Sequence, residues 1–157
     1  MKTVADASSL LLMIKHLNPR DLISIAKELT VLDLSAYEVS NALWKAVMLM
    51  KNLDRKEADL IHKTLFVLLQ HCSTLRLEDL NHDAIMDLAL EKRLTYYDAS
   101  YLHAAASMKL PLTTKSRKLR EAGPEGSVTI SWSEFLEKSG FRLRGDCEKS
   151  FQHDDYT

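Results

Sequence analysis

The stretch TVADAS (residues 3–8) carries the first signal of the fold. Its apolar, β-branched start is typical of a short strand, and Asp6 stands where that strand ends. A helical pattern follows at once, from about Ser9 to Leu17. The same order of strand, polar turn and helix returns along the chain, which indicates an α/β domain.

Four further segments are strand candidates, and helical patterns separate them. The strand candidates are TVLDL (30–34), STLRL (73–77), PLTT (111–114) and SVTIS (127–131). Two of the predicted helices begin at Ser35 and after the cap Asp54. The others run from Pro19 to about Leu29, from Glu78 to Lys92, from Thr95 to about Met108, from Ser116 to Glu121 and from Trp132 to Lys138. We predict a three-layer α/β/α sandwich with a short, mostly parallel central sheet of four or five strands. Residues 1–139 are predicted to form this single domain, and residues 140–157 a polar C-terminal tail.

Size and composition agree with one globular domain. At 157 residues the chain can bury a sizeable core, and its 46% hydrophobic and 27% charged residues are ordinary values. The formal net charge of −1 gives no overall reason to bind nucleic acid or an anionic membrane. Any attraction to a polyanion must therefore be local.

The cysteines and the N-terminal segment indicate the cellular compartment. Cys72 and Cys147 fit no zinc or redox spacing, so two free thiols are expected. The first apolar run, framed by Asp6 and Lys15, lacks the features of a signal peptide. No stretch approaches the roughly 18 to 20 apolar residues of a membrane span. We expect a cytoplasmic protein that does not contact a membrane.

Three carboxylates stand at strand-to-helix turns. Asp6 ends the first strand, Glu38 falls in the first turn of the helix after the second, and Asp98 falls in the first turn of another helix. A parallel sheet would bring all three to one edge, where they repel unless a cation holds them. Ligands with oxygen alone select Mg²⁺ or Mn²⁺ over zinc. Such a site can activate a water for in-line displacement at a phosphate.

Helix capping explains the same residues without a metal. Ser35 and Glu38 have the spacing of a capping box, and Thr95 and Asp98 imitate it. Asp6 could cap the helix that follows it. Spacing alone leaves both interpretations open, and they are compatible, because a capping hydroxyl can also orient a carboxylate toward a metal.

Four motifs in a fixed order make the chain resemble a known family. They are DAS (6–8), YEVSNALWK (37–45), YYDASYLHAAA (96–106) and LPLTTKSRKL (110–119). Over residues 2 to 138 the chain resembles the PIN-domain family, which includes VapC-like ribonuclease toxins. The resemblance implies a metal-dependent endoribonuclease that hydrolyses RNA phosphodiesters, with Mg²⁺ or Mn²⁺ held by Asp6, Glu38 and Asp98. It also implies polar support from Ser8, Asn41 and Thr114, a small antitoxin partner and a homodimer.

The chain departs from the family at one position. The family commonly has another aspartate two residues after the threonine that corresponds to Thr114, and Ser116 stands there. A hydroxyl can hold a water but supplies no charge, so we expect weaker metal binding. Ser116 and Thr114 would then order the water shell. A catalytically weak or inactive PIN-like module, acting as a protein- or RNA-binding partner, is the alternative, and an unrelated α/β domain with capped helices is a third.

A basic run follows Thr114. Lys115, Arg117, Lys118 and Arg120 are four cations within six residues. They are either a solvated helix face or an RNA-binding segment that contacts phosphates without reading sequence.

Overall fold

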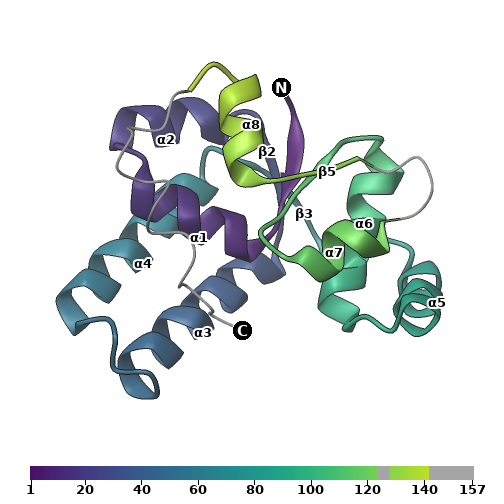
Figure 1. The fold of residues 1–157 in the computed structure, drawn as a ribbon, viewed down its shortest axis with the longest axis horizontal. Helices are drawn as coiled ribbons and strands as arrows, with labels where there is room; N and C mark the ends of the chain where they lie inside the picture. Colours follow the sequence, from purple (N-terminus) through teal and green to yellow (C-terminus); the bar gives the residue numbers. More distant parts are fainter. Residues whose placement is uncertain (124–127, 142–157) are drawn as a thin grey trace.

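The computed structural model describes residues 1–123 and 128–141, and a parallel five-stranded sheet runs through their centre (Figure 1). The strands are β1 (Thr3–Ala5), β2 (Leu29–Leu32), β3 (Ser73–Leu75), β4 (Leu112–Thr113) and β5 (Thr129–Ile130). Their order in the sheet is β3-β2-β1-β4-β5, and each adjacent pair is parallel. The predicted α/β class is confirmed.

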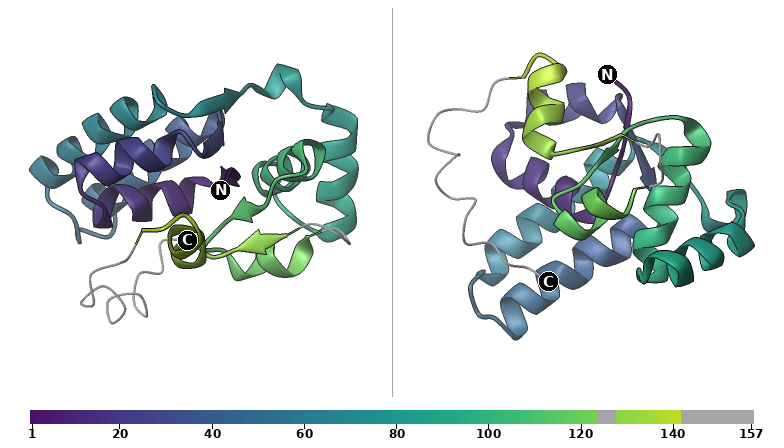
Figure 2. Two further views of the ribbon diagram at one scale, coloured as in Figure 1. Left: turned by 90° about the horizontal axis from the view of Figure 1, so that it is seen from above. Right: turned by 45° about the vertical axis from the view of Figure 1, so that its right-hand side comes forward.

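Helices cover both faces of this sheet (Figures 1 and 2). They are α1 (Ala7–His16), α2 (Pro19–Ala26), α3 (Leu34–Met48), α4 (Arg55–Leu69), α5 (His82–Lys92), α6 (Tyr96–Met108), α7 (Arg117–Ala122) and α8 (Trp132–Lys138). Helices α1 to α4 and α8 pack into one hydrophobic core, and α5 to α7 pack into another. These two cores on either side of the sheet give the predicted three-layer sandwich.

Side-chain alternation along the strands explains the two cores. Ala5 belongs to the core beneath α1, whereas its neighbour Val4 belongs to the core beneath α6. Val31 and Leu32 divide in the same way on β2. Successive strand residues point to opposite faces of the sheet. Because helices cover both faces, consecutive residues of a strand must be apolar.

Several predicted boundaries are wrong. The helix from Pro19 ends at Ala26 rather than near Leu29, which opens β2, and the third strand ends at Leu75 rather than at residue 77. The second strand ends at Leu32 rather than at residue 34, because α3 already begins at Leu34. The helix predicted from Glu78 to Lys92 is divided: Leu77–Asp79 forms a 3₁₀ turn, and α5 begins only after its cap Asn81, whose side chain accepts from the Ala84 amide. A second cap signal inside the apolar pattern thus ends the turn and starts a new helix.

The sheet order reverses beside β1. The chain proceeds outward from β1 to β2 and β3, then returns to place β4 on the other side of β1. The carboxyl ends of β1 and β4 meet there, with Ala5 opposite Thr113. Ligands of parallel α/β sheets bind at such a reversal, which directs attention to the residues that follow these two strands.

Three remaining predictions meet the structure only in part. Cys72 is a free thiol, as expected, and its Sγ donates to the Leu68 carbonyl; Cys147 lies outside the described residues. The predicted tail lies outside them from residue 142 onward. No helix within the described ranges is long and apolar enough to span a membrane.

Candidate metal centre

Asp6 is fixed at the carboxyl end of β1 by residues from two elements. Thr114, the first residue after β4, donates its hydroxyl to Asp6 Oδ2 over 2.6 Å. Ser8 donates to Asp6 Oδ1 over 2.9 Å, and the Ser9 amide donates to the same oxygen over 2.8 Å. Asp6 is therefore both the N-cap of α1 and the end of a buried hydrogen-bond network.

The Asp6 carboxylate is buried, and burial destabilises its ionised form. Its side chain is 5% exposed. Burial raises the pKa of Asp6 above its ordinary value, and the hydrogen bonds from Thr114, Ser9 and Ser8 oppose part of that rise. A cation at this position would favour the ionised form that burial disfavours.

Glu38 extends from α3 toward the same edge of the sheet and is bound by a buried tyrosine. Tyr101 donates its hydroxyl to Glu38 Oε2 over 2.7 Å, and the Tyr101 hydroxyl oxygen lies 2.9 Å from Ser35 Oγ. Burial raises the pKa of Glu38, the bond from Tyr101 lowers it, and the negative charges of Asp6 and Asp98 raise it further. Asp6 and Asp98 thus both lie close enough to Glu38 for their charges to act on it.

Asp98 completes the group from the third residue of α6. It is half-buried, and its amide is capped by the Thr95 hydroxyl over 3.1 Å. As the side chains stand, no three carboxylate, histidine or thiol groups in the described residues converge closely enough to hold a metal ion. The fold therefore brings the three acids to one edge without drawing them into a finished coordination shell.

The structure agrees with only part of the helix-capping interpretation. Asp6 and Thr95 are N-caps, as that interpretation requires. Ser35 is not a cap: α3 begins one residue before it, and its hydroxyl lies against Tyr101. Glu38 is consequently the fifth residue of α3, beyond the first turn where the sequence placed it. The predicted capping box of Ser35 and Glu38 is wrong, and capping leaves the hydrogen bond from Tyr101 to the partly buried Glu38 unexplained.

The predicted supporting residues take different positions. Ser8 and Thr114 bind Asp6 directly. Asn41 lies about one turn beyond Glu38 on α3 and lines the adjoining cavity. Ser116 caps α7 by accepting from the Leu119 amide over 3.3 Å, and its own amide donates to Thr114 Oγ1 over 2.9 Å. Two hydrogen bonds in series thus connect Ser116 to Asp6.

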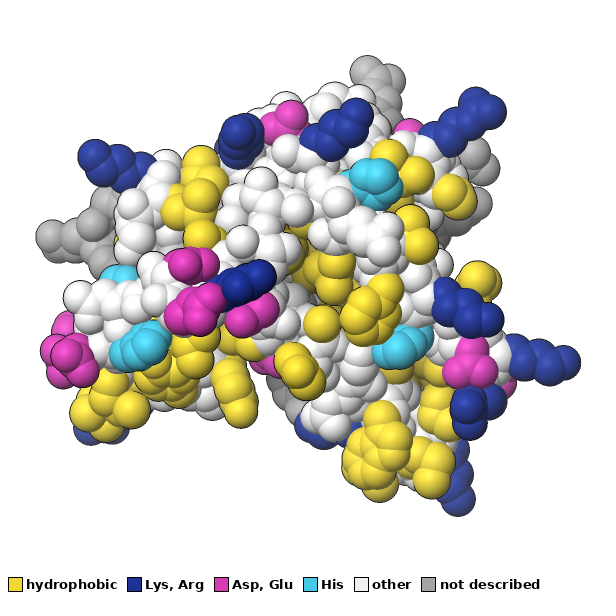
Figure 3. Space-filling model, turned by 180° about the vertical axis from the view of Figure 1, so that it is seen from behind, with side chains coloured by type: hydrophobic (Ala, Val, Ile, Leu, Met, Phe, Trp, Pro, Cys, Tyr) yellow, Lys and Arg dark blue, Asp and Glu magenta, His cyan; other side chains and the backbone are white. Residues whose placement is uncertain are grey.

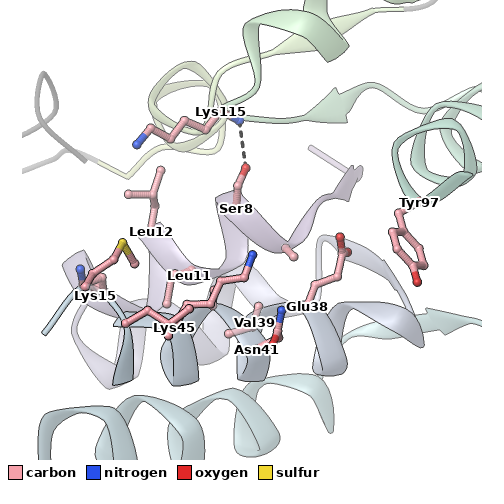
Figure 4. A pocket seen from close by; sticks show the side chains of 14 residues that line it. Ser8, Leu11, Leu12, Lys15, Glu38, Val39, Asn41, Lys45, Tyr97 and Lys115 are labelled. Atoms are coloured by element: carbon pink, nitrogen blue, oxygen red, sulfur yellow. Dashed lines mark hydrogen bonds between the residues drawn. The ribbon is translucent and has the colours of Figure 1, made fainter. Parts of the chain in front are cut away.

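A cavity of about 620 Å³ opens beside Glu38 (Figure 4). It is lined by Ala7, Ser8, Leu11, Leu12 and Lys15 of α1, by Glu38, Val39, Asn41, Ala42 and Lys45 of α3, by Leu49 and Met50, by Tyr97 of α6 and by Lys115. Of the predicted RNA-binding cations, Lys115 lines this cavity. Arg117, Lys118 and Arg120 are exposed on α7 outside the lining, and Arg117 pairs with Glu121 over 2.6 Å.

Sequence reasoning missed two site residues. Tyr101 follows Asp98 by three residues, so both lie on one face of α6, and that spacing was the available signal. Lys45 follows Glu38 by seven residues, which places it on the same side of α3 two turns further along. Neither residue belongs to a run of similar residues, and only the packing of α3 against its neighbours makes the positions informative.

Replacing Tyr101 by Phe should loosen Glu38 while leaving the core filled. Because a buried hydrogen bond to a charged group contributes about 1.5–3 kcal/mol, we expect the free energy of unfolding to fall by about that amount at neutral pH. The pKa of Glu38 should rise further, since its donor is lost. Urea unfolding and carboxyl NMR titration measure the two effects. Tyr97→Phe, which removes an exposed hydroxyl, is the control, and an unshifted Glu38 pKa in Tyr101→Phe would contradict the prediction.

The fold and the site together define a class. A parallel sheet in the order β3-β2-β1-β4-β5, with acids after β1, on α3 and on α6, is the arrangement of a PIN-type domain. Exonuclease VapC9 of Pyrobaculum aerophilum is 34% identical to the chain over 127 residues, which cover 81% of the chain and 89% of that relative. Ribonuclease VapC3 of the same organism is 33% identical over 129 residues, 79% of the chain and 96% of the relative.

A solved structure agrees with these relatives. The crystal structure of PAE2754 from Pyrobaculum aerophilum superimposes with a TM-score of 0.73 at 28% identity, covering 89% of this chain and 90% of that one. No family model matches the chain. On the identity to its two relatives, the chain belongs to the VapC family of PIN-domain proteins.

Proposed function

We propose that the chain is a Mg²⁺- or Mn²⁺-dependent endoribonuclease and the toxin of a toxin–antitoxin pair. The observation that carries this proposal is that Asp6 lies at the reversal of the sheet, held by Thr114 and Ser8, and that the charges of Asp6 and Asp98 both act on Glu38. The relatives named as an exonuclease and a ribonuclease support nuclease chemistry. RNA is accordingly the substrate that we propose.

The donor set fits a hard divalent cation. Its ligands would be carboxylate oxygens of Asp6, Glu38 and Asp98, and two of these groups carry pKa values that burial raises. When bound, such an ion lowers the pKa of a water and neutralises charge on the phosphate. Thr114 and Ser8 hold the Asp6 carboxylate, and Tyr101 holds that of Glu38. Binding would require the three carboxylates to approach more closely than they lie in this structure.

Cleavage of a circular RNA tests the proposed activity. A circle has no ends, so its cleavage requires an endonuclease, whereas an exonuclease shortens only linear RNA. We expect Mn²⁺ to support cutting of labelled circular and linear single strands, and EDTA to stop both. Shortening of linear RNA alone would identify an exonuclease. Failure to cut either RNA, together with no Mn²⁺ binding by calorimetry, would refute the metal-dependent nuclease.

A second candidate is a catalytically weak or inactive PIN-like module that binds protein or RNA. Ser116 favours it, because the position that is commonly acidic in the family carries a neutral side chain here. The observed role of Ser116 is to cap α7, and this requires no metal. The two candidates differ in what an added carboxylate at this position would do.

We further propose that the protein acts in the cytoplasm as a homodimer that binds a small antitoxin. Several groups of hydrophobic side chains are exposed on the face turned away from the view of Figure 1 (Figure 3). The most exposed large apolar side chains on α3 and α5 are Tyr37, Trp44, Met48, Met86 and Leu90. Aromatic residues and methionine are enriched at protein interfaces, which supports a protein partner on these helices.

A further inference from the structure

The hydroxyl of Ser8 lies across both oxygens of the Asp6 carboxylate. Ser8 Oγ is 2.9 Å from Asp6 Oδ1 and 3.0 Å from Asp6 Oδ2. The backbone amide of Lys115, in the segment after β4, donates to the same hydroxyl oxygen over 3.3 Å, and Figure 4 shows this bond. The hydroxyl is thus held between the carboxylate and a second element of the fold.

The other two donors to Asp6 leave little room on its carboxylate for a cation. A carboxylate has about four lone-pair positions, shared equally between its oxygens. The Ser9 amide takes one on Oδ1 over 2.8 Å, and the Thr114 hydroxyl takes one on Oδ2 over 2.6 Å. Ser8 spans the remaining position on each oxygen. A divalent cation binds a carboxylate through these same lone pairs, so the ion and the Ser8 hydroxyl compete for one place.

Ser8 also stands on the cavity side of Asp6. Among the described residues, those that line the cavity include Ser8 and Glu38 but not Asp6, which is 5% exposed. An ion that reaches Glu38 through the cavity therefore meets the Ser8 side chain before the Asp6 carboxylate. Rotation about the Cα–Cβ bond of Ser8 to another staggered position would move its hydroxyl off the carboxylate.

Helix capping alone does not require this hydroxyl. Asp54 caps α4 by accepting from the amide three residues further on over 2.9 Å, and Lys56 stands at the position that corresponds to Ser8. Asp6 makes the equivalent capping bond with the Ser9 amide. The contact of Ser8 with both carboxylate oxygens is therefore additional to the cap. Burial raises the pKa of Asp6, and the bond from Ser8 is one of those that oppose the rise.

We propose that the Ser8 hydroxyl occupies the position on Asp6 that a divalent cation takes, so that the ion binds by displacing it. The inference rests on the proposed nuclease and adds to it a residue that controls access to the metal site. It also fixes the sign of an effect. Removing a hydroxyl that only supports the site weakens metal binding, whereas removing one that competes with the ion strengthens it.

Calorimetric titration with Mn²⁺ at one neutral pH compares Ser8→Ala with wild type and with Ser133→Ala. Ser133 is a matched control, because it holds the second position of α8 and its hydroxyl lies 3.0 Å from that of its own cap, Ser131. We expect Ser8→Ala to bind Mn²⁺ about tenfold more tightly, near the lower end of what a hydrogen bond to a charged group contributes. Ser8→Thr, which keeps the hydroxyl, and Ser133→Ala should match wild type.

Hydrogen exchange of backbone amides in wild type provides a second measurement, which needs no variant. The Lys115 amide loses this acceptor when the Ser8 hydroxyl moves away, so it should exchange several-fold faster with Mg²⁺ bound. The Ser9 amide, whose acceptor is Asp6 Oδ1, should stay protected. A Lys115 exchange rate that bound Mg²⁺ leaves unchanged or lowers would mean that Ser8 stays in place, and the displacement would be wrong.

The titration also separates this inference from the proposed function. Mn²⁺ affinity that is unchanged or weaker in Ser8→Ala would overturn the displacement and retain the metal site. Failure of both wild type and Ser8→Ala to bind Mn²⁺ would remove the metal site and the displacement with it. Binding by Ser8→Ala when wild type fails to bind would support the displacement and show that the hydroxyl closes the site.

Discussion

Replacing Glu38 by Gln should abolish the stabilisation of the protein by Mn²⁺ and reduce RNA cleavage roughly a hundredfold or more. Wild type at a Mn²⁺ concentration one hundred times its Kd should gain about 2.7 kcal/mol, and the variant should gain nothing. The loss in rate corresponds to about 2.7 kcal/mol of barrier at 1.36 kcal/mol per tenfold. Thermal melting with and without Mn²⁺ and single-turnover cleavage measure both effects.

Without metal, the difference in stability between Glu38→Gln and wild type should change with pH in a definite direction. The pKa of Glu38 in the folded chain is raised above its ordinary value of 4.5, so the ionised side chain costs the fold stability. The contribution of Glu38 is most favourable below 4.5 and is lost as pH rises through the raised folded value. Gln does not titrate, so Glu38→Gln should equal wild type near pH 4 and exceed it in stability at neutral pH.

A control and a contrary outcome complete this prediction. Glu137→Gln, on the exposed side of α8, should melt like wild type and keep the full Mn²⁺ response. A Glu38→Gln variant that melts earlier at neutral pH while wild type also ignores Mn²⁺ would mean that Glu38 serves only the structure. The metal site would then have to be abandoned.

Replacing Ser116 by Asp should tighten Mn²⁺ binding about tenfold or more, equivalent to about 1.4 kcal/mol, and raise cleavage. Asp caps helices as well as Ser, so α7 should keep its start. The added charge stands two hydrogen bonds from Asp6, through Thr114, and increases the repulsion that a cation relieves. Without metal the variant should melt earlier than wild type for the same reason.

A matched serine provides the control. Ser131 caps α8 in the same way, accepting from the Glu134 amide over 3.1 Å, and it is not among the residues around Asp6 or the cavity. Ser131→Asp should leave Mn²⁺ binding and cleavage unchanged. A Ser116→Asp variant that binds Mn²⁺ tightly yet cuts no RNA would favour the inactive module. Unchanged Mn²⁺ binding would exclude position 116 from the metal site.

The elements of the fold could be predicted from local patterns. Short β-branched segments ending in polar residues marked the strands, and Asp6, Pro19, Asp54 and Thr95 marked helix starts. These signals are local because a cap acts on amides within three residues of itself. The missed division at Asn81 is of the same kind, since its cap signal was present but the apolar pattern ran through it.

The grouping of the acids followed from topology as well as from sequence. Parallel strands place their carboxyl ends at one edge, so assigning β1 and β4 was enough to put Asp6 and Thr114 at the same edge of the sheet. Their adjacency across β1 and β4 depends on the sheet order, which local patterns do not specify. The family resemblance, and not the spacing of the acids, favoured the interpretation as metal ligands over the interpretation as helix caps.

The sequence by itself determined which residue types follow which strands, and thereby the α/β class and three candidate acids. Only the tertiary structure decided that Ser35 meets Tyr101 rather than capping α3, that Tyr101 holds Glu38, and that Lys45 faces Lys15 and Lys115 across a cavity. The physical reason is distance along the chain. Glu38 and Tyr101 are 63 residues apart, and a contact of that kind exists only after two helices have packed on one sheet.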